Sequence, residues 1–384
     1  MRGRQTLTNP ATLSRRGFAR TIGAGAAYAA LRPAGELKGS WGSLLPEVTS
    51  SSSEAKLVRL SSNENPYGPS PASLKAMTNG FSLAWRYPDE HADMLSEELS
   101  KLNNVQLDQV LLGDGSGEIL KLSAAAFTRD KKLVIGNPTF EAIAHHAGVA
   151  NAEVVKINLT ADYHHDLQKM LVAADGAGLV YICNPNNPTA SITPKKEMAE
   201  FLSKLNRQTM VLVDEAYHHY VESNDYESVI PLVKDNPNLI VARTFSKIYG
   251  MAGLRCGYCV TRSENIKRMS PHQIFDSVNI MAVVAALAGL KDLNHVTQGR
   301  KLNSEVRKAV SVELDTLGYR YIPSHANFMM IDLRREAKPV IGDLRKRGVE
   351  VGRVFPALPT FMRVTIGTSS QMKAFLTAFQ EVMV

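Results

Sequence analysis

Cysteine is scarce in this chain of 384 residues, which contains only Cys183, Cys256 and Cys259. Three unevenly spaced cysteines cannot form the disulfide framework of a small secreted domain. The run from Cys256 to Cys259 has the spacing of a redox motif. However, it lies in a strand-like stretch and not at a helix start, where a thiolate is stabilised. We therefore expect neither structural disulfides nor thiol redox chemistry.

Other signals are also missing. No repeat of fixed period is present. The formal net charge is +7, but the basic residues are spread along the chain, which favours a solvated surface over a nucleic-acid site. Three histidine pairs lack both metal-ligand spacing and neighbouring carboxylates, so we expect no metal site. These pairs are His145-His146, His164-His165 and His218-His219.

Length and composition indicate a soluble protein with two domains. Hydrophobic residues make up 44% of the chain and charged residues 21%, and the length exceeds that at which a single core keeps growing. Strand-like and helix-like segments alternate, as at 110–112, 118–126 and 132–135. This alternation is typical of an α/β fold with a mainly parallel sheet.

The first 34 residues have the form of a twin-arginine export signal. Arg15 and Arg16 precede a weakly apolar, Gly/Ala-rich segment at 21–31, which is too short and too mild for a stable membrane anchor. Residues 35–54 are Gly/Ser-rich and are interpreted as a linker. We expect the twin-arginine machinery to export the folded precursor to the periplasm or beyond. The alternative is a disordered basic tail on a cytoplasmic protein.

Three motifs follow short apolar runs at intervals of about 30 residues, which places each at the end of a predicted parallel strand, where α/β sheets bind ligands. They are Asn184-Pro185-Asn186-Asn187-Pro188-Thr189, Val213-Asp214-Glu215-Ala216-Tyr217 and Thr244-Phe245-Ser246-Lys247. Taken singly, each has an ordinary structural explanation, such as a turn or a helix cap. Their joint occurrence in this order indicates a cofactor site.

The residue types in these motifs suit pyridoxal 5'-phosphate. Lys247 supplies an amine for the aldehyde and a base and acid for proton transfer. Asp214 supplies a carboxylate for the ring nitrogen, while Asn187 and Tyr217 can donate to the phenolic oxygen. Phe140 can lie flat on the ring.

A second set of residues suits the phosphate group. Arg255 and the hydroxyl groups of Thr244 and Ser246 can bind an anion. The Gly-rich run 113–118, before a helical pattern, offers backbone N–H groups at a helix N-terminus. This run alone is weak evidence, because glycines before a helix are common.

The motifs resemble those of class I/II, fold-type I aminotransferases, and more closely the histidinol-phosphate aminotransferase-like branch. The resemblance runs from about residue 57 to the C-terminus. It is carried by Asn63-Glu64-Asn65-Pro66-Tyr67-Gly68-Pro69, Arg86-Tyr87-Pro88-Asp89, Thr244-Phe245-Ser246-Lys247 and Leu254-Arg255-Cys256-Gly257-Tyr258.

The resemblance implies a large domain at 86–288 with a mainly parallel central sheet, and a smaller α/β domain formed by 55–85 and 289–384. It implies catalytic roles for Lys247, Asp214 and Tyr217, with a Schiff base at Lys247. The implied cofactor contacts are Gly115, Ser116, Gly117, Phe140, Asn187, Asp214, Tyr217, Thr244, Ser246, Lys247, Arg255 and Tyr87.

Tyr87 resembles a residue that reaches the phosphate of a neighbouring subunit, so the resemblance also implies a homodimer with shared sites. The implied substrate contacts are Arg363, Arg353 and Tyr67. The expected reaction is ping-pong transfer of an amino group from an amino acid or related amine, such as histidinol phosphate, to a 2-oxo acid.

The sequence departs from the branch at a few positions and leaves two alternatives open. Ala190, Gly117 and Phe140 replace residues usual in the branch, and Arg353 aligns only approximately with its second anion-binding arginine. A lyase or decarboxylase that uses the same cofactor and fold is the first alternative, because a fold does not fix a reaction. The second is an exported binding protein without catalysis, which the presence of Lys247 and Asp214 disfavours.

Overall fold

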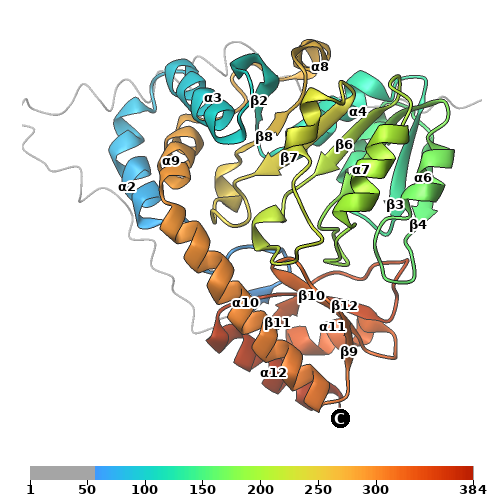
Figure 1. Ribbon diagram of the computed structural model, residues 1–384. Coiled ribbons are helices and arrows are strands. Elements are labelled where there is room, and N and C mark those ends of the chain that lie inside the picture. The colour runs from blue at the N-terminus through green and yellow to red at the C-terminus, as the bar shows by residue number, and fades with distance from the viewer. Residues whose placement is uncertain (1–56, 384) are drawn as a thin grey trace, which may run out of the picture. The chain divides into compact units, whose positions relative to one another are not determined.

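The computed structural model describes residues 57–383, which belong to a compact unit extending from Glu54 to Val384 (Figure 1). The proposed leader (1–34) and linker (35–54) lie outside the described residues. Within the unit, apolar side chains form one set of clusters around a central sheet and a separate cluster around the C-terminal strands. The domain boundaries near residues 86 and 288 stay a prediction.

The central sheet confirms the α/β fold expected from the alternating segments. Within residues 57–383 it has seven strands in the order β2-β8-β7-β6-β5-β3-β4. Strands β4, β3, β5, β6 and β7 are parallel, whereas β8 is antiparallel to both of its neighbours. The strands are β2 (Val110–Gly113), β3 (Lys132–Asn137), β4 (Val154–Asn158), β5 (Ala177–Cys183), β6 (Met210–Asp214), β7 (Leu239–Thr244) and β8 (Gly257–Val260).

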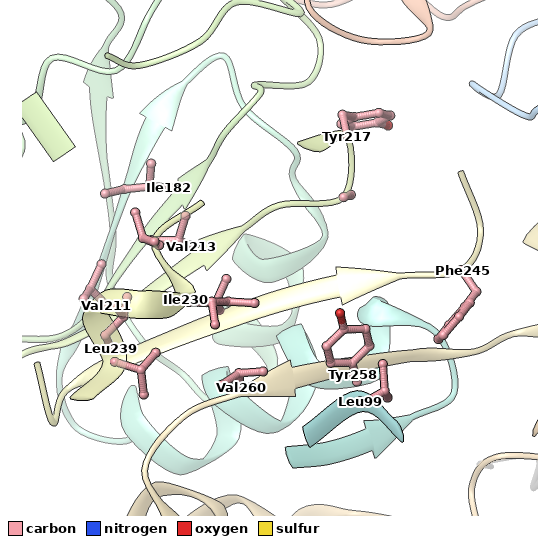
Figure 2. Packing of buried hydrophobic residues seen from close by; sticks show 14 of the residues in the cluster. Leu99, Ile182, Val211, Val213, Tyr217, Ile230, Leu239, Phe245, Tyr258 and Val260 are labelled. Atoms are coloured by element: carbon pink, nitrogen blue, oxygen red, sulfur yellow. The ribbon is translucent and has the colours of Figure 1, made fainter. Parts of the chain in front are cut away.

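Both faces of this sheet are covered by helices, because its central strands are apolar on both sides. Val211 and Val213 of β6 face a cluster that includes residues of α3, α6, α7 and α9, whereas Met210 and Leu212 face α4, α5 and α8. Figure 2 shows Val211 and Val213 in the first cluster. Successive side chains of a strand point to opposite faces of the sheet. A parallel strand buried on both faces is therefore expected to be apolar at every position.

The helices of this part of the chain are α2 (Pro71–Gly80), α3 (Asp89–Asn103), α4 (Ser116–Phe127), α5 (Ala142–Val149), α6 (Leu167–Ala173), α7 (Lys195–Lys204), α8 (Ser263–Met269) and α9 (Ile280–Lys291). Several begin at side-chain caps. Ser70 accepts from the Ser73 amide before α2, and Asn279 accepts from the Ala282 amide before α9. Such caps satisfy amide groups that have no partner in the first turn.

The C-terminal part of the unit has its own sheets and core. Its elements are α10 (Leu293–Thr316), β9 (Arg320–Ile322), β10 (Phe328–Asp332), α11 (Ala337–Lys346), β11 (Val349–Val351), β12 (Phe361–Thr365) and α12 (Ser369–Met383). Strands β12, β10 and β9 form an antiparallel sheet, and β11 pairs in parallel with β1 (Val58–Leu60). Strand β1 therefore lies beside the C-terminal part of the chain, and so does the segment that follows β1.

Helix α10 links the two sets of clusters, and Figure 1 shows it extending from beside α9 to the C-terminal sheet. Asp292 caps its first turn by accepting from the His295 amide. Among residues 57–383, no single helix has the length and hydropathy of a membrane span. Helices α9 and α10 pass that test only as a pair, bent by 82°.

Candidate active site

The three motifs meet at one cavity of about 330 Å³, beyond the carboxyl ends of β5, β6 and β7. Parallel neighbouring strands bring their carboxyl ends to the same edge of a sheet, so motifs about 30 residues apart become adjacent. The cavity is lined by Ser62, Asn63, Ser116, Gly117, Phe140, Ala142, Cys183, Asn187, Asp214, Ala216, Tyr217, Thr244, Ser246, Lys247, Ala252, Arg255 and Arg363.

Asp214 is the last residue of β6 and is 3% exposed. Its Oδ2 accepts from the Tyr181 hydroxyl at 3.0 Å and its Oδ1 accepts from the Ala216 amide at 3.1 Å. Burial raises the pKa of Asp214 to about 6, although these two hydrogen bonds act in the opposite direction. A buried carboxylate of this kind is stabilised when a cation binds beside it.

Lys247 extends from the segment after β7 toward the segment after β1. Its Nζ donates to the carbonyl oxygen of Asn63 at 3.1 Å and to that of Ser62 at 3.4 Å. Burial, followed by the positive charge of Arg363, lowers the pKa of Lys247 to about 8. The neutral amine, which nucleophilic attack and proton abstraction require, is therefore easier to form near neutral pH than in a free lysine.

Two further groups that line the cavity, Asn187 and Tyr217, can donate to a bound oxygen anion. Arg363 Nη1 donates to Asn187 Oδ1 at 2.7 Å, and because arginine has no acceptor, this contact leaves the Asn187 NH₂ group free to donate elsewhere. The Tyr217 hydroxyl accepts from Asn63 Nδ2 at 3.1 Å, so its own proton is also available. Burial raises the pKa of Tyr217 and keeps the phenol protonated.

An anion cradle lies at the first turn of α4. Gly115 precedes the helix with φ of 71° and provides no side-chain cap, so the amide groups of Ser116 and Gly117 stay available to a ligand. A Cβ on Gly115 would meet the Arg255 guanidinium. Arg255 Nη1 in turn donates to Ser246 Oγ at 3.3 Å, and Thr244 Oγ1 donates to the same oxygen at 3.0 Å.

Four further residues that the resemblance implies as contacts do not all line this cavity. Phe140 lines the cavity and is 40% exposed, whereas Tyr67 and Tyr87 lie outside its lining, with Tyr87 78% exposed. Arg353 pairs with Glu141 at 2.5 Å and does not line this cavity. It lines an adjoining one instead, which shares Arg363 with the first. The implied roles of these four residues stay predictions.

Sequence reasoning missed two polar residues that contact the central groups. Tyr181, fully buried on β5, donates to Asp214. Asn63, 1% exposed, contacts both Lys247 and Tyr217. Asn63 belongs to a motif noted for its resemblance, but nothing in the motif indicates which side chain turns inward. Tyr181 had a weak signal, since it lies two residues before Cys183 on a strand that ends at the cavity.

The residues present fit pyridoxal phosphate. The cavity combines a lysine of lowered pKa, two donors to an oxygen anion and a buried carboxylate that forms no salt bridge with any residue the structure describes. Phe140 lines the same cavity, and a Cβ at Gly115 would displace the Arg255 guanidinium from the anion cradle. When bound, this cofactor supplies an aldehyde and an electron-withdrawing ring.

The chemistry that the chain itself contributes follows from these positions. Lys247 would hold the cofactor through its aldehyde and carry a proton at Nζ, Asp214 would stabilise positive charge on the ring, and Tyr217 and Asn187 would donate to the ring oxygen. Arg363 also lines the cavity, where its guanidinium can bind an anionic group of a substrate.

Comparisons with known proteins identify the family and the fold. The family described as aminotransferase class I and II matches residues 55–379. A histidinol-phosphate aminotransferase from Moorella thermoacetica is 37% identical over 332 residues, which span 85% of this chain and 86% of that protein.

Solved structures show the same fold. A putative histidinol-phosphate aminotransferase from Erwinia carotovora atroseptica has a TM-score of 0.82 and 31% identity, and the match covers 85% of this chain and 95% of that one. The histidinol-phosphate aminotransferase from Sinorhizobium meliloti, in complex with pyridoxal-5'-phosphate, has a TM-score of 0.80 and 24% identity, with 85% and 91% covered.

Proposed function

Because this chain belongs to the class I and II aminotransferases and is a pyridoxal-phosphate-dependent transaminase, we propose that its amino donor is histidinol phosphate or a closely similar anionic amine. The similar proteins named above support this choice, since two carry the name histidinol-phosphate aminotransferase and a third carries it as putative. The acceptor is then a 2-oxo acid.

The observation that carries the proposal is the adjoining cavity. It has a volume of about 390 Å³, shares Ser62 and Arg363 with the cofactor cavity, and is also lined by Arg345 and Arg353. Three guanidinium groups around one space favour a substrate with an anionic group beyond the reacting amine. Arg345 is paired with Glu350 at 2.9 Å and Arg353 with Glu141 at 2.5 Å, whereas Arg363 has no carboxylate partner among the described residues. An anionic group would bind Arg363 directly and would compete with Glu141 for Arg353.

The test compares histidinol phosphate with histidinol, which lacks the phosphate, as donors for the purified enzyme. We expect the phosphate to raise kcat/KM by at least about a hundredfold, and Arg353→Ala to remove most of that preference, at about 1.4 kcal/mol for each tenfold change. Lys346→Ala is the control, since Lys346 is the neighbouring surface cation on α11 and pairs with Asp343. Equal use of both donors would contradict the proposal.

The same assay separates transamination from lyase chemistry. When only a donor is supplied, a transaminase converts one equivalent per active site and stops, because no acceptor restores the aldehyde form. A lyase continues to turn over without an acceptor. We expect conversion of a single equivalent, and continued product formation would contradict the assignment as a transaminase.

We also propose a homodimer with shared active sites. Several large apolar side chains near Tyr87 in the sequence are exposed, among them Phe81 at 66% and Trp85 at 80%. Burial of such a surface between two copies is a common reason for exposed aromatic residues. Light scattering gives the mass directly. Mixing Tyr87→Ala subunits with Lys247→Ala subunits should restore part of the activity if Tyr87 acts across the interface, and none if it does not.

Finally, we propose that residues 1–34 direct export by the twin-arginine route. Replacing Arg15 and Arg16 with lysine keeps the charge but removes the guanidinium groups that a receptor would read. The double variant should remain in the cytoplasm with full activity, whereas the parent chain should reach the periplasm. Equal distribution of both forms after cell fractionation would identify the segment as an ordinary basic tail.

A further inference from the structure

Asn63 lies on the segment after β1, far in sequence from the residues it contacts at the active site. It is 1% exposed and adopts a left-handed backbone conformation with φ of 54°. Asparagine adopts this region more readily than most residues, but the conformation is still uncommon and persists where surrounding contacts fix it. The question is what these contacts achieve.

Asn63 contacts two of the groups assigned to the chemistry. Its side-chain Nδ2 donates to the Tyr217 hydroxyl at 3.1 Å, and its carbonyl oxygen accepts from Lys247 Nζ at 3.1 Å. A hydroxyl oxygen that accepts from Asn63 directs its own O–H away from Asn63. The Tyr217 proton is thus free to point into the cavity, where the oxygen of a bound cofactor would accept it.

The C-terminal sheet holds Asn63 in turn. Thr365 Oγ1 accepts from the Asn63 backbone amide at 2.9 Å and donates to Asn63 Oδ1 at 3.2 Å. Asn327 Nδ2 donates to the Asn63 carbonyl oxygen at 3.0 Å. The Thr365 hydroxyl therefore orients the amide so that its NH₂ group faces Tyr217.

We propose that Asn63 is a positioning residue for transamination, which orients the Tyr217 hydroxyl as a donor and holds the Lys247 amine through its carbonyl oxygen. Thr365 contributes by fixing the Asn63 amide. The proposal rests on transaminase chemistry and does not depend on which amine is the donor. A different amino donor would therefore leave this proposal unchanged.

The direct readout is the pH midpoint of the absorbance band of the lysine-bound cofactor. Hydrogen bonds to the ring oxygen favour its ionised form and lower the basicity of the neighbouring nitrogen. Loss of an oriented Tyr217 donor should raise that midpoint. For Asn63→Ala we expect a rise of roughly one pH unit, with a fall in kcat larger than any rise in KM.

Three further variants sharpen the test. Asn63→Asp keeps the size but replaces the donor with an acceptor, and should raise the midpoint at least as far as alanine does. Thr365→Val should raise it less, and adding it to Asn63→Ala should change nothing more. Asn65→Ala is the matched control, because Asn65 lies on the same segment but donates to the Ile248 carbonyl oxygen at 2.8 Å. It should leave the midpoint unchanged.

Two results would overturn the proposal. One is a midpoint in Asn63→Ala and Asn63→Asp no higher than in Asn65→Ala, even with reduced activity, because Asn63 would then only support the fold. The other is a full additional shift when Thr365→Val is combined with Asn63→Ala, because the two residues would then act separately. If Asn63→Ala fails to fold, as judged by circular dichroism, Asn63→Asp and Thr365→Val decide the question with the same readout.

Discussion

Replacement of Asp214 with asparagine should have opposite effects on the protein without cofactor and on the holoenzyme. Asp214 is 3% exposed, and its carboxylate has no cation within hydrogen-bonding distance among the described residues. Asparagine is nearly the same size. Its oxygen can still accept from the Ala216 amide, and the Tyr181 hydroxyl can rotate to accept from its NH₂ group. The substitution therefore removes mainly the charge.

The magnitude follows from the pKa of Asp214, which burial raises from its ordinary 3.8 to about 6. The pKa difference is about 2, and each pH unit corresponds to about 1.4 kcal/mol. At about pH 7.5 the buried charge therefore lowers the free energy of unfolding of the apoprotein by about 3 kcal/mol. Because the folded-state pKa is raised, this loss is complete above about pH 6 and disappears as the pH falls toward 3.8. At about pH 5 roughly half of it should remain.

Apo Asp214→Asn should therefore be more stable than the apo parent by up to about 3 kcal/mol at about pH 7.5, and by about half as much at about pH 5. The holoenzyme should behave oppositely, since the cofactor stabilises the folded state by an amount set by its affinity. Without a carboxylate beside the ring, we expect a smaller gain in stability on cofactor binding and a fall in transamination of several orders of magnitude.

Urea unfolding of both forms, with and without cofactor at the two pH values, measures these differences. Asp130→Asn is the control, because the Asp130 side chain is 94% exposed, and it should change none of them. The reasoning is refuted if apo Asp214→Asn is no more stable than the parent at the higher pH and gains as much stability from the cofactor.

Three further predictions concern Lys247 and the anion cradle. Lys247→Ala should fold but hold no cofactor that borohydride can fix covalently to the protein, and a persistent adduct by mass spectrometry would disprove the assignment. In the unaltered apoprotein, the rate of cofactor attachment should rise about tenfold per pH unit below about pH 8 and level off above it, because burial lowers the pKa of Lys247 to about 8; a rate that keeps rising to pH 10, as for a free lysine, would argue against this. Gly115→Ala should weaken cofactor binding by at least about tenfold, because the new Cβ would meet the Arg255 guanidinium. Gly176→Ala is the control, since Gly176 has a similar φ of 68° but open space around it. This control should bind cofactor normally, which separates the effect of backbone strain from loss of the cradle.

The sequence by itself is sufficient to predict the edge of the sheet at which the site lies and the residues that follow its strands. Asp214 and Thr244 are the last residues of β6 and β7, as their apolar runs predict. Parallel pairing then brings Asn187, Tyr217 and Lys247 to one cavity. These predictions were possible because strand periodicity and the chemistry of ligand types are local properties of the chain.

Tertiary structure alone decided the contacts between distant segments. Pairing of β1 with β11 brings the segment after β1 to the C-terminal strands, where Asn63 contacts Thr365, 302 residues away in sequence, and its carbonyl oxygen accepts from Lys247. No local pattern specifies such a pairing, because the hydrogen bonds of a strand are the same whichever partner it meets. Burial has the same origin, since the raised pKa of Asp214 and the lowered pKa of Lys247 depend on how completely the surrounding chain excludes water.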